Sequence, residues 1–400
     1  MSPTSPPAAH PFGLALALAL AAAVSLGFAR FSYALLLPPM RAELHWSYFV
    51  AGAMNTANAA GYLAGALLAP RWFARFDAGR VLTAGGLGAA LALAGHAFAR
   101  DDAMLYALRT LTGIASAATF VGGGLLAARL AQHAAHPGRV LGLYYGGTGL
   151  GIVGSTLIVP PLPWRAAWLA LAAASLACTL ITAAAIAAAR RGPAALQTAP
   201  AQGGGHASAR WGPMAPALAS YLMFGFGYIG YMTFIVTLLR EQGVGAGLIA
   251  GFYALLGAGV VASSWLWAGV LQRARGGQAL VLLNALLAVA TLVPVLGTQP
   301  LVVAASCLLF GCTFLSVVAS TTAFVRHNLP AAAWTAGIAA FTIVFAAGQI
   351  LGPSLTGWLA DGPGGLRRGF LGSAAALALG AALALRQKAL APPKGPVAAD

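Results

Sequence analysis

Long apolar runs separated by short polar breaks dominate the sequence, and twelve of them are long enough to cross a membrane as a helix. Such a helix needs about 20 residues to span roughly 30 Å of hydrocarbon. None of the runs alternates apolar and polar residues as the strands of a membrane barrel do. Helix is therefore expected for each run, because lipid offers no water to free backbone groups. The approximate limits are 12–39, 48–69, 80–99, 103–128, 139–160, 166–189, 214–239, 246–270, 278–297, 300–325, 332–359 and 369–386.

The breaks between the runs carry proline, glycine or charge, as is typical of helix ends. Examples are Pro38–Pro39, Pro160–Pro161 and Asp361–Gly362–Pro363. We therefore expect the first helix to end at its pair of prolines, and the fold to be an all-α polytopic membrane protein with twelve transmembrane helices.

One break is longer than the others and divides the chain into two sets of six helices. Residues 190–213 are rich in glycine, alanine and proline and contain no long apolar run, which is typical of a flexible linker. The predicted organisation is a six-helix bundle at 1–189, a cytoplasmic linker at 190–213, a second six-helix bundle at 214–388 and a disordered cytoplasmic tail at 389–400.

The two halves repeat each other when the first is shifted by 198 residues. The shift places Gly27, Phe28 and Tyr33 on Gly225, Phe226 and Tyr231, Gly61 on Gly259, and Gly113 on Gly311. Parallel repeats of this kind are an architecture of membrane transporters, so we expect the two bundles to be pseudo-symmetric.

Composition excludes most other classes of protein. The 400 residues are 60% hydrophobic and only 7% charged, whereas a soluble domain is about 45–50% apolar and about 25% charged. The net charge of +15 does not indicate a nucleic-acid partner, because the basic residues are spread over short gaps between apolar runs. The three cysteines lie inside apolar runs and form no metal or disulfide motif. No cofactor and no metal are expected.

The basic residues also predict an orientation. With the N-terminus inside, the cytoplasmic segments hold fourteen of the 22 Lys and Arg residues and the outer loops hold six, as the positive-inside rule requires. Residues 1–11 contain no Lys or Arg, so we interpret the first run as a retained helix rather than a signal peptide. Both termini are expected in the cytoplasm.

Two arginines, Arg30 and Arg109, lie inside apolar runs. A charge in hydrocarbon is costly and usually faces a functional cavity. At 1.5 Å per residue, Arg30 lies roughly 7 Å and Arg109 roughly 10 Å outward of the middle of its helix, so the two guanidinium groups could share one level. Two alternatives remain open: Arg30 could bind backbone carbonyls, and Arg109 could extend to the outer interface.

The carboxylates that would balance these arginines are missing from the runs. No acidic residue lies between Asp102 and Glu241, or between Glu241 and Asp361. A buried carboxylate is the usual partner of a cationic substrate or a proton, so its absence favours an anionic substrate that supplies the negative charge. The 198-residue shift places Arg30 on Tyr228 and Arg109 on Cys307. The positive charge therefore belongs to one half, and we expect Tyr228 and Tyr231 to face it.

Other small motifs have less specific meanings. Asn55 and Asn58 share a helix face and could bind a substrate or a neighbouring helix. The Gly-x-x-x-Gly pairs, beginning at Gly61, Gly147 and Gly348, are typical of close helix packing. A Gly-x-Gly-x-x-Gly match at 149–154 lacks the preceding strand and the following acid of a dinucleotide site.

These features together resemble the major facilitator superfamily. Leu105-x-x-x-Arg109-x-x-x-Gly113 is similar to the helix-4 motif of the superfamily, and Gly348-Gln349-Ile350-Leu351-Gly352-Pro353 with Gly357 is similar to its Gly-Pro helix-packing motif. The string Gly27-x-x-Arg30-Phe31-x-Tyr33, followed by Asn58-x-x-Gly61-Tyr62, resembles the YbfB/YjiJ-like branch. One departure concerns the loop after the second helix, where the usual Asp is absent and Asp77 stands at a different spacing.

The predicted function is secondary transport by alternating access in a bacterial inner membrane, with a small organic anion such as a carboxylate as substrate. The resemblance implies the bacterial membrane, the alternating-access mechanism and a cavity lined by the first, fourth, seventh and tenth helices. The candidate substrate-binding residues are Arg30, Tyr33, Asn58, Tyr62, Arg109, Tyr228, Tyr231 and Gln349. Expected partners are the substrate, a possible coupling proton and the lipid bilayer. The alternatives are proton-driven efflux of drugs or metabolites and, remotely, a membrane receptor or an intramembrane enzyme.

Overall fold

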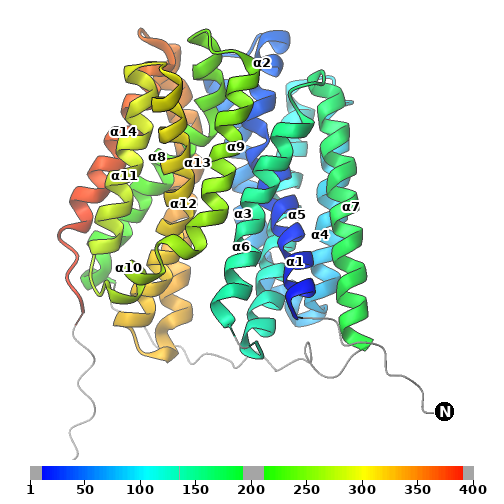
Figure 1. Cartoon of the computed structure of the whole chain (residues 1–400), viewed down its shortest axis with the longest axis vertical. Coiled ribbons are helices and arrows are strands. Elements are labelled where there is room, and N and C mark those ends of the chain that lie inside the picture. Colours follow the sequence, from blue (N-terminus) through cyan, green and yellow to red (C-terminus); the bar gives the residue numbers. More distant parts are fainter. Residues whose placement is uncertain (1–10, 135, 192–210, 391–400) are drawn as a thin grey trace, which may run out of the picture.

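The computed structural model describes residues 11–134, 136–191 and 211–390, and its long helices stand side by side across the molecule (Figure 1). The first half contains α1 (Pro11–Ala22), η1 (Ala23–Phe31), α2 (Tyr33–Leu44), α3 (Tyr48–Arg75), α4 (Ala78–His96), α5 (Asp102–Gln132), α6 (Pro137–Ile158) and α7 (Trp164–Arg191). The second half contains η2 (Gly212–Met214), α8 (Ala215–Glu241), α9 (Ala246–Leu266), α10 (Ala268–Arg273), α11 (Gln278–Leu296), α12 (Pro300–Asn328), η3 (Ala331–Ala333), α13 (Trp334–Asp361) and α14 (Gly365–Ala384).

The described residues form twelve helical segments of membrane length when α1, η1 and α2 are counted as one continuous segment. Ten of these are both long and apolar enough to cross a membrane by length and composition. The other two, α3 and α6, are less apolar because α3 carries Asn55, Thr56 and Asn58 and α6 is rich in glycine. The all-α fold class is therefore confirmed.

The prediction that Pro38–Pro39 end the first helix is wrong. Helix α2 continues through both prolines to Leu44. Proline lacks an N–H group and its ring crowds the carbonyl four residues earlier, so an isolated helix would break there. Here α2 packs on α8 and buries its apolar side chains from Tyr33 to Leu37 and at Met40. Tertiary packing therefore overrides the local signal.

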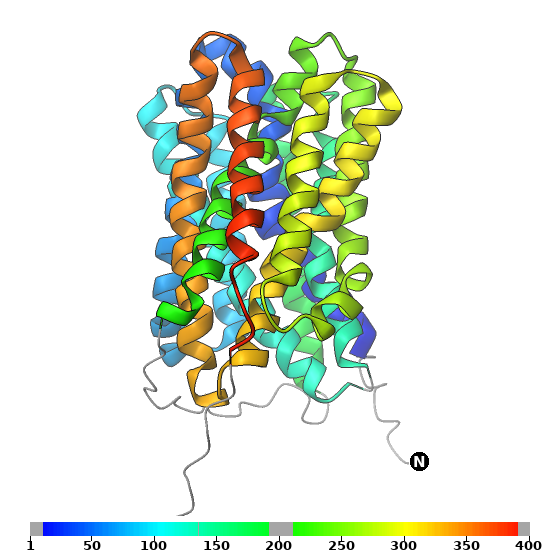
Figure 2. The same ribbon diagram turned by 90° about the vertical axis from the view of Figure 1, so that its left-hand side faces the viewer.

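Contacts between the halves are concentrated in two helix pairs, α3 with α13 and α6 with α9, and α2 also packs on α8. Within the first half, α4 packs on α5 and α7. Within the second half, α14 packs on α8 and α11, in the front of the view in Figure 2. The division into bundles at 1–189 and 214–388 remains a prediction. The predicted linker at 190–213 and tail at 389–400 lie almost entirely outside the described residues.

Glycine contacts reproduce the 198-residue repeat. A Cβ on Gly61 would overlap the backbone of Thr110, and one on Gly259 would overlap the backbone at Leu308, which is 198 residues after Thr110. Likewise, Gly113 lies against the Asn58 carbonyl and Gly311 against the Leu256 carbonyl. The pairs α3–α5 and α9–α12 therefore pack in the same register, and their glycines are required because backbone meets backbone there.

Candidate functional site

A π-helical segment carries the first buried arginine. All nine residues of η1 are buried, and the Ser32 N–H donates to the Gly27 carbonyl oxygen, five residues earlier, at 2.9 Å. A Cβ on Gly27 would overlap the backbone of Gly151 on α6, so this turn lies directly against a neighbouring helix. Segments of π-helix are rare and occur frequently at functional sites. This feature singles out the turn that holds Arg30.

The Arg30 side chain crosses from one half of the molecule to the other. It is 4% exposed, and its Nη2 donates to Oε1 of Gln349 on α13. The centroid of the Tyr62 ring lies 5.7 Å from its Cζ, and that of Phe31 lies 5.8 Å away. Its Nε has no hydrogen-bond partner. Because buried polar groups are nearly always hydrogen-bonded, this nitrogen is available for a ligand.

Arg109, by contrast, donates to protein oxygens from each of its three nitrogens. Its Nε donates to the Met54 carbonyl at 3.3 Å, its Nη1 to the Ala29 carbonyl at 3.1 Å and its Nη2 to Asn55 Oδ1 at 3.2 Å. The Tyr33 ring lies 4.6 Å from its Cζ. Arg109 is 1% exposed, so it does not extend to the interface. The carbonyl contacts considered for Arg30 are made by Arg109, which joins α5 to α3 and η1.

The two asparagines of α3 have different contacts around Arg109. The Asn58 Nδ2 donates to the Arg109 carbonyl at 3.2 Å, whereas the Asn55 Nδ2 donates to Thr233 Oγ1 on α8 at 2.7 Å. Asn55 thus links the arginine to the second half. The sequence draws attention to Asn55 by its spacing from Asn58, but no local signal identifies Thr233.

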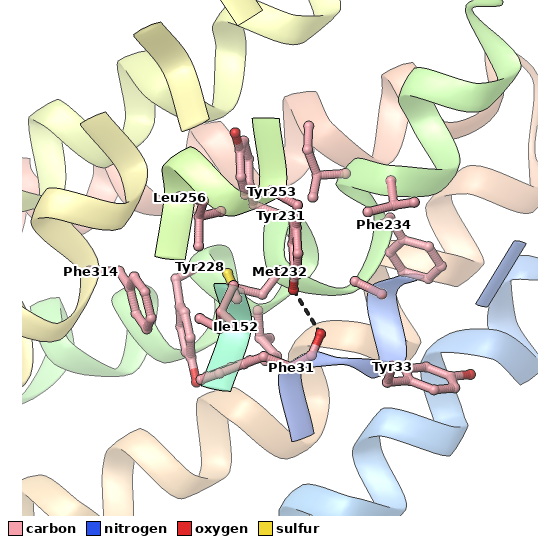
Figure 3. Close-up of a cluster of buried hydrophobic side chains, with 14 of the residues drawn as sticks. Phe31, Tyr33, Ile152, Tyr228, Tyr231, Met232, Phe234, Tyr253, Leu256 and Phe314 are labelled. Atoms are coloured by element: carbon pink, nitrogen blue, oxygen red, sulfur yellow. Dashed lines mark hydrogen bonds between the residues drawn. The ribbon is translucent and has the colours of Figure 1, made fainter. Parts of the chain in front are cut away.

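Figure 3 shows three of the predicted tyrosines, Tyr33, Tyr228 and Tyr231, in one cluster of buried side chains. Tyr228 is 3% exposed, and its ring centroid lies 4.8 Å from that of Phe224 and 5.9 Å from that of Phe314. Phe314 in turn contacts Phe31, the residue next to Arg30, with ring centroids 5.8 Å apart. Tyr231 instead stacks on Phe310 at 3.9 Å.

The hydroxyl groups of two of the four predicted tyrosines, Tyr231 and Tyr33, have protein partners. That of Tyr231 lies 3.1 Å from Ser306 Oγ and 3.3 Å from Cys307 Sγ. That of Tyr33 donates to the Ala51 carbonyl at 2.9 Å. The structure therefore brings Arg30, Tyr62 and Gln349 together, with Tyr228 nearby. Tyr33 and Asn58 lie around Arg109, and Tyr231 packs within the second half.

No carboxylate balances either buried arginine among the described residues. The ion pairs among the described residues are Arg41–Glu241, Arg165–Glu43 and Arg190–Asp77, and none includes Arg30 or Arg109. Glu241 also accepts from the Tyr48 hydroxyl. Asp361 accepts from the backbone N–H groups of Tyr48 at 2.7 Å and Phe49 at 2.9 Å. Glu241 and Asp361 are thus both engaged at the end of the molecule where α2 finishes, and neither pairs with Arg30 or Arg109.

Asp77 does not link the halves. Its side chain caps α4 by accepting from the N–H groups of Gly79 at 2.8 Å and Arg80 at 3.2 Å, and it pairs with Arg190 of α7. Partial burial acts to raise the pKa of Asp77, but the Arg190 charge and these hydrogen bonds outweigh it and hold the pKa below its usual value. Each of these partners belongs to the first half, so Asp77 secures that half internally.

Comparison with known proteins places this arrangement in a family. The family model described as "Uncharacterised MFS-type transporter YbfB" matches residues 22–385, which is most of the chain. The chain belongs to this family of major facilitator transporters. It is therefore a transporter and not an enzyme. No curated protein matches the chain.

Solved structures share the fold of this major facilitator transporter at low sequence identity. A bacterial homologue of the human lysosomal transporter Spinster, inward-facing and unoccupied, has a TM-score of 0.71 and 14% identity over 95% of this chain and 96% of its own. The nucleoside transporter NupG has a TM-score of 0.66 and 14% identity over 92% and 96%. A mutant of the peptide transporter POT has a TM-score of 0.72 and 14% identity over 94% and 93%.

Proposed function

We propose that this major facilitator transporter is a secondary active carrier that moves a small organic anion, such as a carboxylate, by alternating access. The observation that carries this proposal is Arg30, a buried guanidinium with no acidic partner among the described residues and with a free Nε. Its neighbours along the chain supply no negative charge, so a solute that does so would relieve a costly buried cation.

The chemistry of the guanidinium group favours a carboxylate. Nε and Nη2 form one edge of the planar group, and such an edge can donate two parallel hydrogen bonds to the two oxygens of a carboxylate. In the structure, Gln349 occupies Nη2 and Nε is unpaired. A carboxylate would displace the Gln349 oxygen and engage both nitrogens. Because Arg30 and Gln349 belong to different halves, this exchange couples binding to the contact between the halves.

The contacts at the ends of the bundles support alternating access. Arg41 pairs with Glu241 at 3.5 Å, and Asp361 caps the N-terminus of α3, so both contacts join the halves at one end. None of the ion pairs in the described residues joins the halves at the opposite end. We infer an orientation in a bacterial inner membrane with both termini in the cytoplasm. The end that carries the Arg41–Glu241 and Asp361 contacts is then the outer one.

Uptake by the purified protein in liposomes tests the proposal. We expect a labelled panel of small carboxylates to contain a substrate, and we expect Arg30→Gln to abolish its uptake while Arg30→Lys retains part of it. Gln349→Glu places a carboxylate beside Arg30 and should likewise abolish anion uptake. The matched control is Arg100→Gln, since Arg100 is exposed in a loop.

Two outcomes would contradict the proposal. Undiminished carboxylate uptake by Arg30→Gln would remove the site assignment. Uptake or expulsion of cations driven by a pH gradient, with no transport of any anion, would favour proton-driven efflux instead. The related structures are named as nucleoside and peptide transporters, so neutral nucleosides and peptides belong in the same panel.

A further inference from the structure

A cavity lies on the first half of the molecule, between α4, α5 and the C-terminal end of α3. Its volume is about 730 Å³. Apart from Arg80 at one end, every residue that lines it is apolar, and Arg30, Tyr62 and Gln349 do not take part in it. It is therefore separate from the proposed anion site and needs an occupant of different chemistry.

Small residues make this cavity a groove along two helices. Ala84, Gly85 and Gly88 of α4 line it, together with Ala115 and Ala118 of α5. Gly85 is needed for helix packing, because a Cβ there would lie 2.8 Å from the Ala115 carbonyl oxygen. Gly88 is different: a Cβ there would meet only the Ala115 methyl group, at 3.5 Å. The groove is open at Gly88 because that residue has no side chain.

The length of the groove matches one leaflet of a bilayer. Its α4 lining extends from Arg80 to Ala92, which corresponds to about 18 Å along a helix axis. Half of the hydrocarbon thickness of a membrane is about 15 Å. Large apolar side chains at its edges are exposed, including Leu91 at 74% and Leu111 at 55%. An extended acyl chain has the length and the apolar character to fill this space.

The end of the groove beside Arg80 is positively charged. Arg71, Arg75 and Arg80 are all exposed there, and none of them takes part in an ion pair among the described residues. Asp77 is the acid nearest to them in the sequence, and it already pairs with Arg190. Trp72 also lines this end, and tryptophan is enriched at the interface between lipid and water. Arginine binds phosphate through strong charge-assisted hydrogen bonds.

We propose that this groove binds an anionic phospholipid, with one acyl chain between α4 and α5 and the headgroup phosphate on Arg80. Arg75 and Arg71 add to the attraction. In the orientation inferred above, the lipid comes from the inner leaflet. The site uses residues that the anion-transport proposal does not need, so either proposal can fail without the other.

Native mass spectrometry of the full chain, with phosphatidylglycerol or phosphatidylcholine of identical acyl chains, tests this site. We expect the wild-type protein to retain phosphatidylglycerol about tenfold more strongly, the effect of one charged hydrogen bond. Gly88→Leu should fill the groove and abolish this retention. Gly251→Leu is the matched control, because a Cβ on Gly251, an exposed glycine of α9, would meet nothing within 4 Å.

A second pair of variants tests the headgroup contact without altering the apolar lining of the groove. Arg80→Gln should remove this roughly tenfold preference for phosphatidylglycerol, and Arg80→Glu should reverse it in favour of phosphatidylcholine. The matched control is Arg368→Gln, an exposed arginine on α14. Equal retention of the two lipids by the wild-type protein, or unchanged retention in both Gly88→Leu and Arg80→Glu, would overturn the proposal.

Discussion

The two buried arginines differ in their hydrogen-bond partners, and this difference predicts opposite effects of mutation. Each of the three nitrogens of Arg109 donates to a protein oxygen, whereas Arg30 has Nη2 bonded to Gln349 and a buried Nε without a partner. A buried group with all its partners is structural, and one with an unmet donor is open to a ligand. We therefore propose that Arg109 positions η1 and α3, whereas Arg30 binds the substrate.

Arg109→Gln should lower the thermal stability of the detergent-solubilised protein by an amount that corresponds to about 1–3 kcal/mol, because it leaves buried oxygens without donors. Arg30→Gln should change stability little and abolish transport. A melting curve followed by circular dichroism, with Arg100→Gln as the control, measures the stability of both variants. The liposome uptake assay measures their transport. Equal melting temperatures for Arg109→Gln and the control would refute the structural role.

At Asp77, a charge and a helix cap predict a pH-dependent effect. Asp77→Ala should destabilise the protein by about 1 kcal/mol, since the first turn of α4 loses its cap, while Asp77→Asn keeps an oxygen acceptor and loses less. The pKa of Asp77 is lowered in the folded protein. Its charge therefore stabilises the fold above the ordinary carboxyl pKa of about 4, and this contribution is lost as the pH falls through the lower folded value.

Thermal unfolding of the wild-type and Asn variants at neutral and acidic pH checks this prediction. The difference in stability between them should be largest at neutral pH and should shrink in acid. A difference that grows as the pH falls would show that the Asp77–Arg190 pair does not stabilise the folded state.

At the level of helices, the repeated glycines make a matched prediction for both halves. Gly113→Ala and Gly311→Ala should each destabilise the protein by about 1–3 kcal/mol, because a methyl group would overlap backbone atoms of the neighbouring helix. Gly251→Ala is the control, since its Cβ would meet no atom within 4 Å. Yield and melting temperature in detergent measure the effect. A melting temperature for Gly311→Ala at or above that of the control would contradict the packing argument.

The helices show which parts of the fold could be predicted from sequence. Apolar length alone predicts the membrane-spanning segments, because burying backbone in lipid leaves helix as the solution. The path through Pro38 and Pro39 could not be predicted, since packing on α8 decides it. The π-helical turn at Arg30 is also invisible in the sequence, because its hydrogen bonds depend on contacts with α6 and α5.

The candidate site was predictable in its residue types and not in its pairings. Charge in an apolar run identifies both arginines, but only the fold shows which one reaches Gln349 and which one is enclosed by carbonyls. Tyr228 and Tyr231 are three residues apart on α8. Even so, Tyr231 packs against Phe310 of α12, whereas Tyr228 stacks on Phe224 and on Phe345 of α13. Such choices depend on neighbouring helices that are distant in the sequence.

At the scale of the whole molecule, the polar contacts at the end near Asp361 predict a shift in conformation. Asp361→Asn should weaken the cap on α3 and favour opening of that end, because the amide cannot accept from both Tyr48 and Phe49 as the carboxylate does. A cysteine at Ser354, which lies 2.8 Å from Thr56 across the α3–α13 contact, reports the opening. In a background without native cysteines, its labelling by an impermeant maleimide should increase severalfold.

Asp101→Asn is the control for this experiment. Asp101 caps α5 through the Met104 N–H within the first half, so its substitution should not change the labelling of the cysteine. Equal labelling in Asp361→Asn and Asp101→Asn would show that the Asp361 cap does not hold that end closed.

The glycines between the halves have one further consequence. Gly52 lies against the carbonyl of Pro353, and Gly149 lies against that of Gly257. In parts of the α3–α13 and α6–α9 contacts, main chain therefore meets main chain with no side chain between. Surfaces without protruding side chains can slide past each other without any rotamer having to disengage. Tilting one half against the other therefore costs little free energy at the α3–α13 and α6–α9 contacts. Even a single added methyl group there would slow the transport cycle.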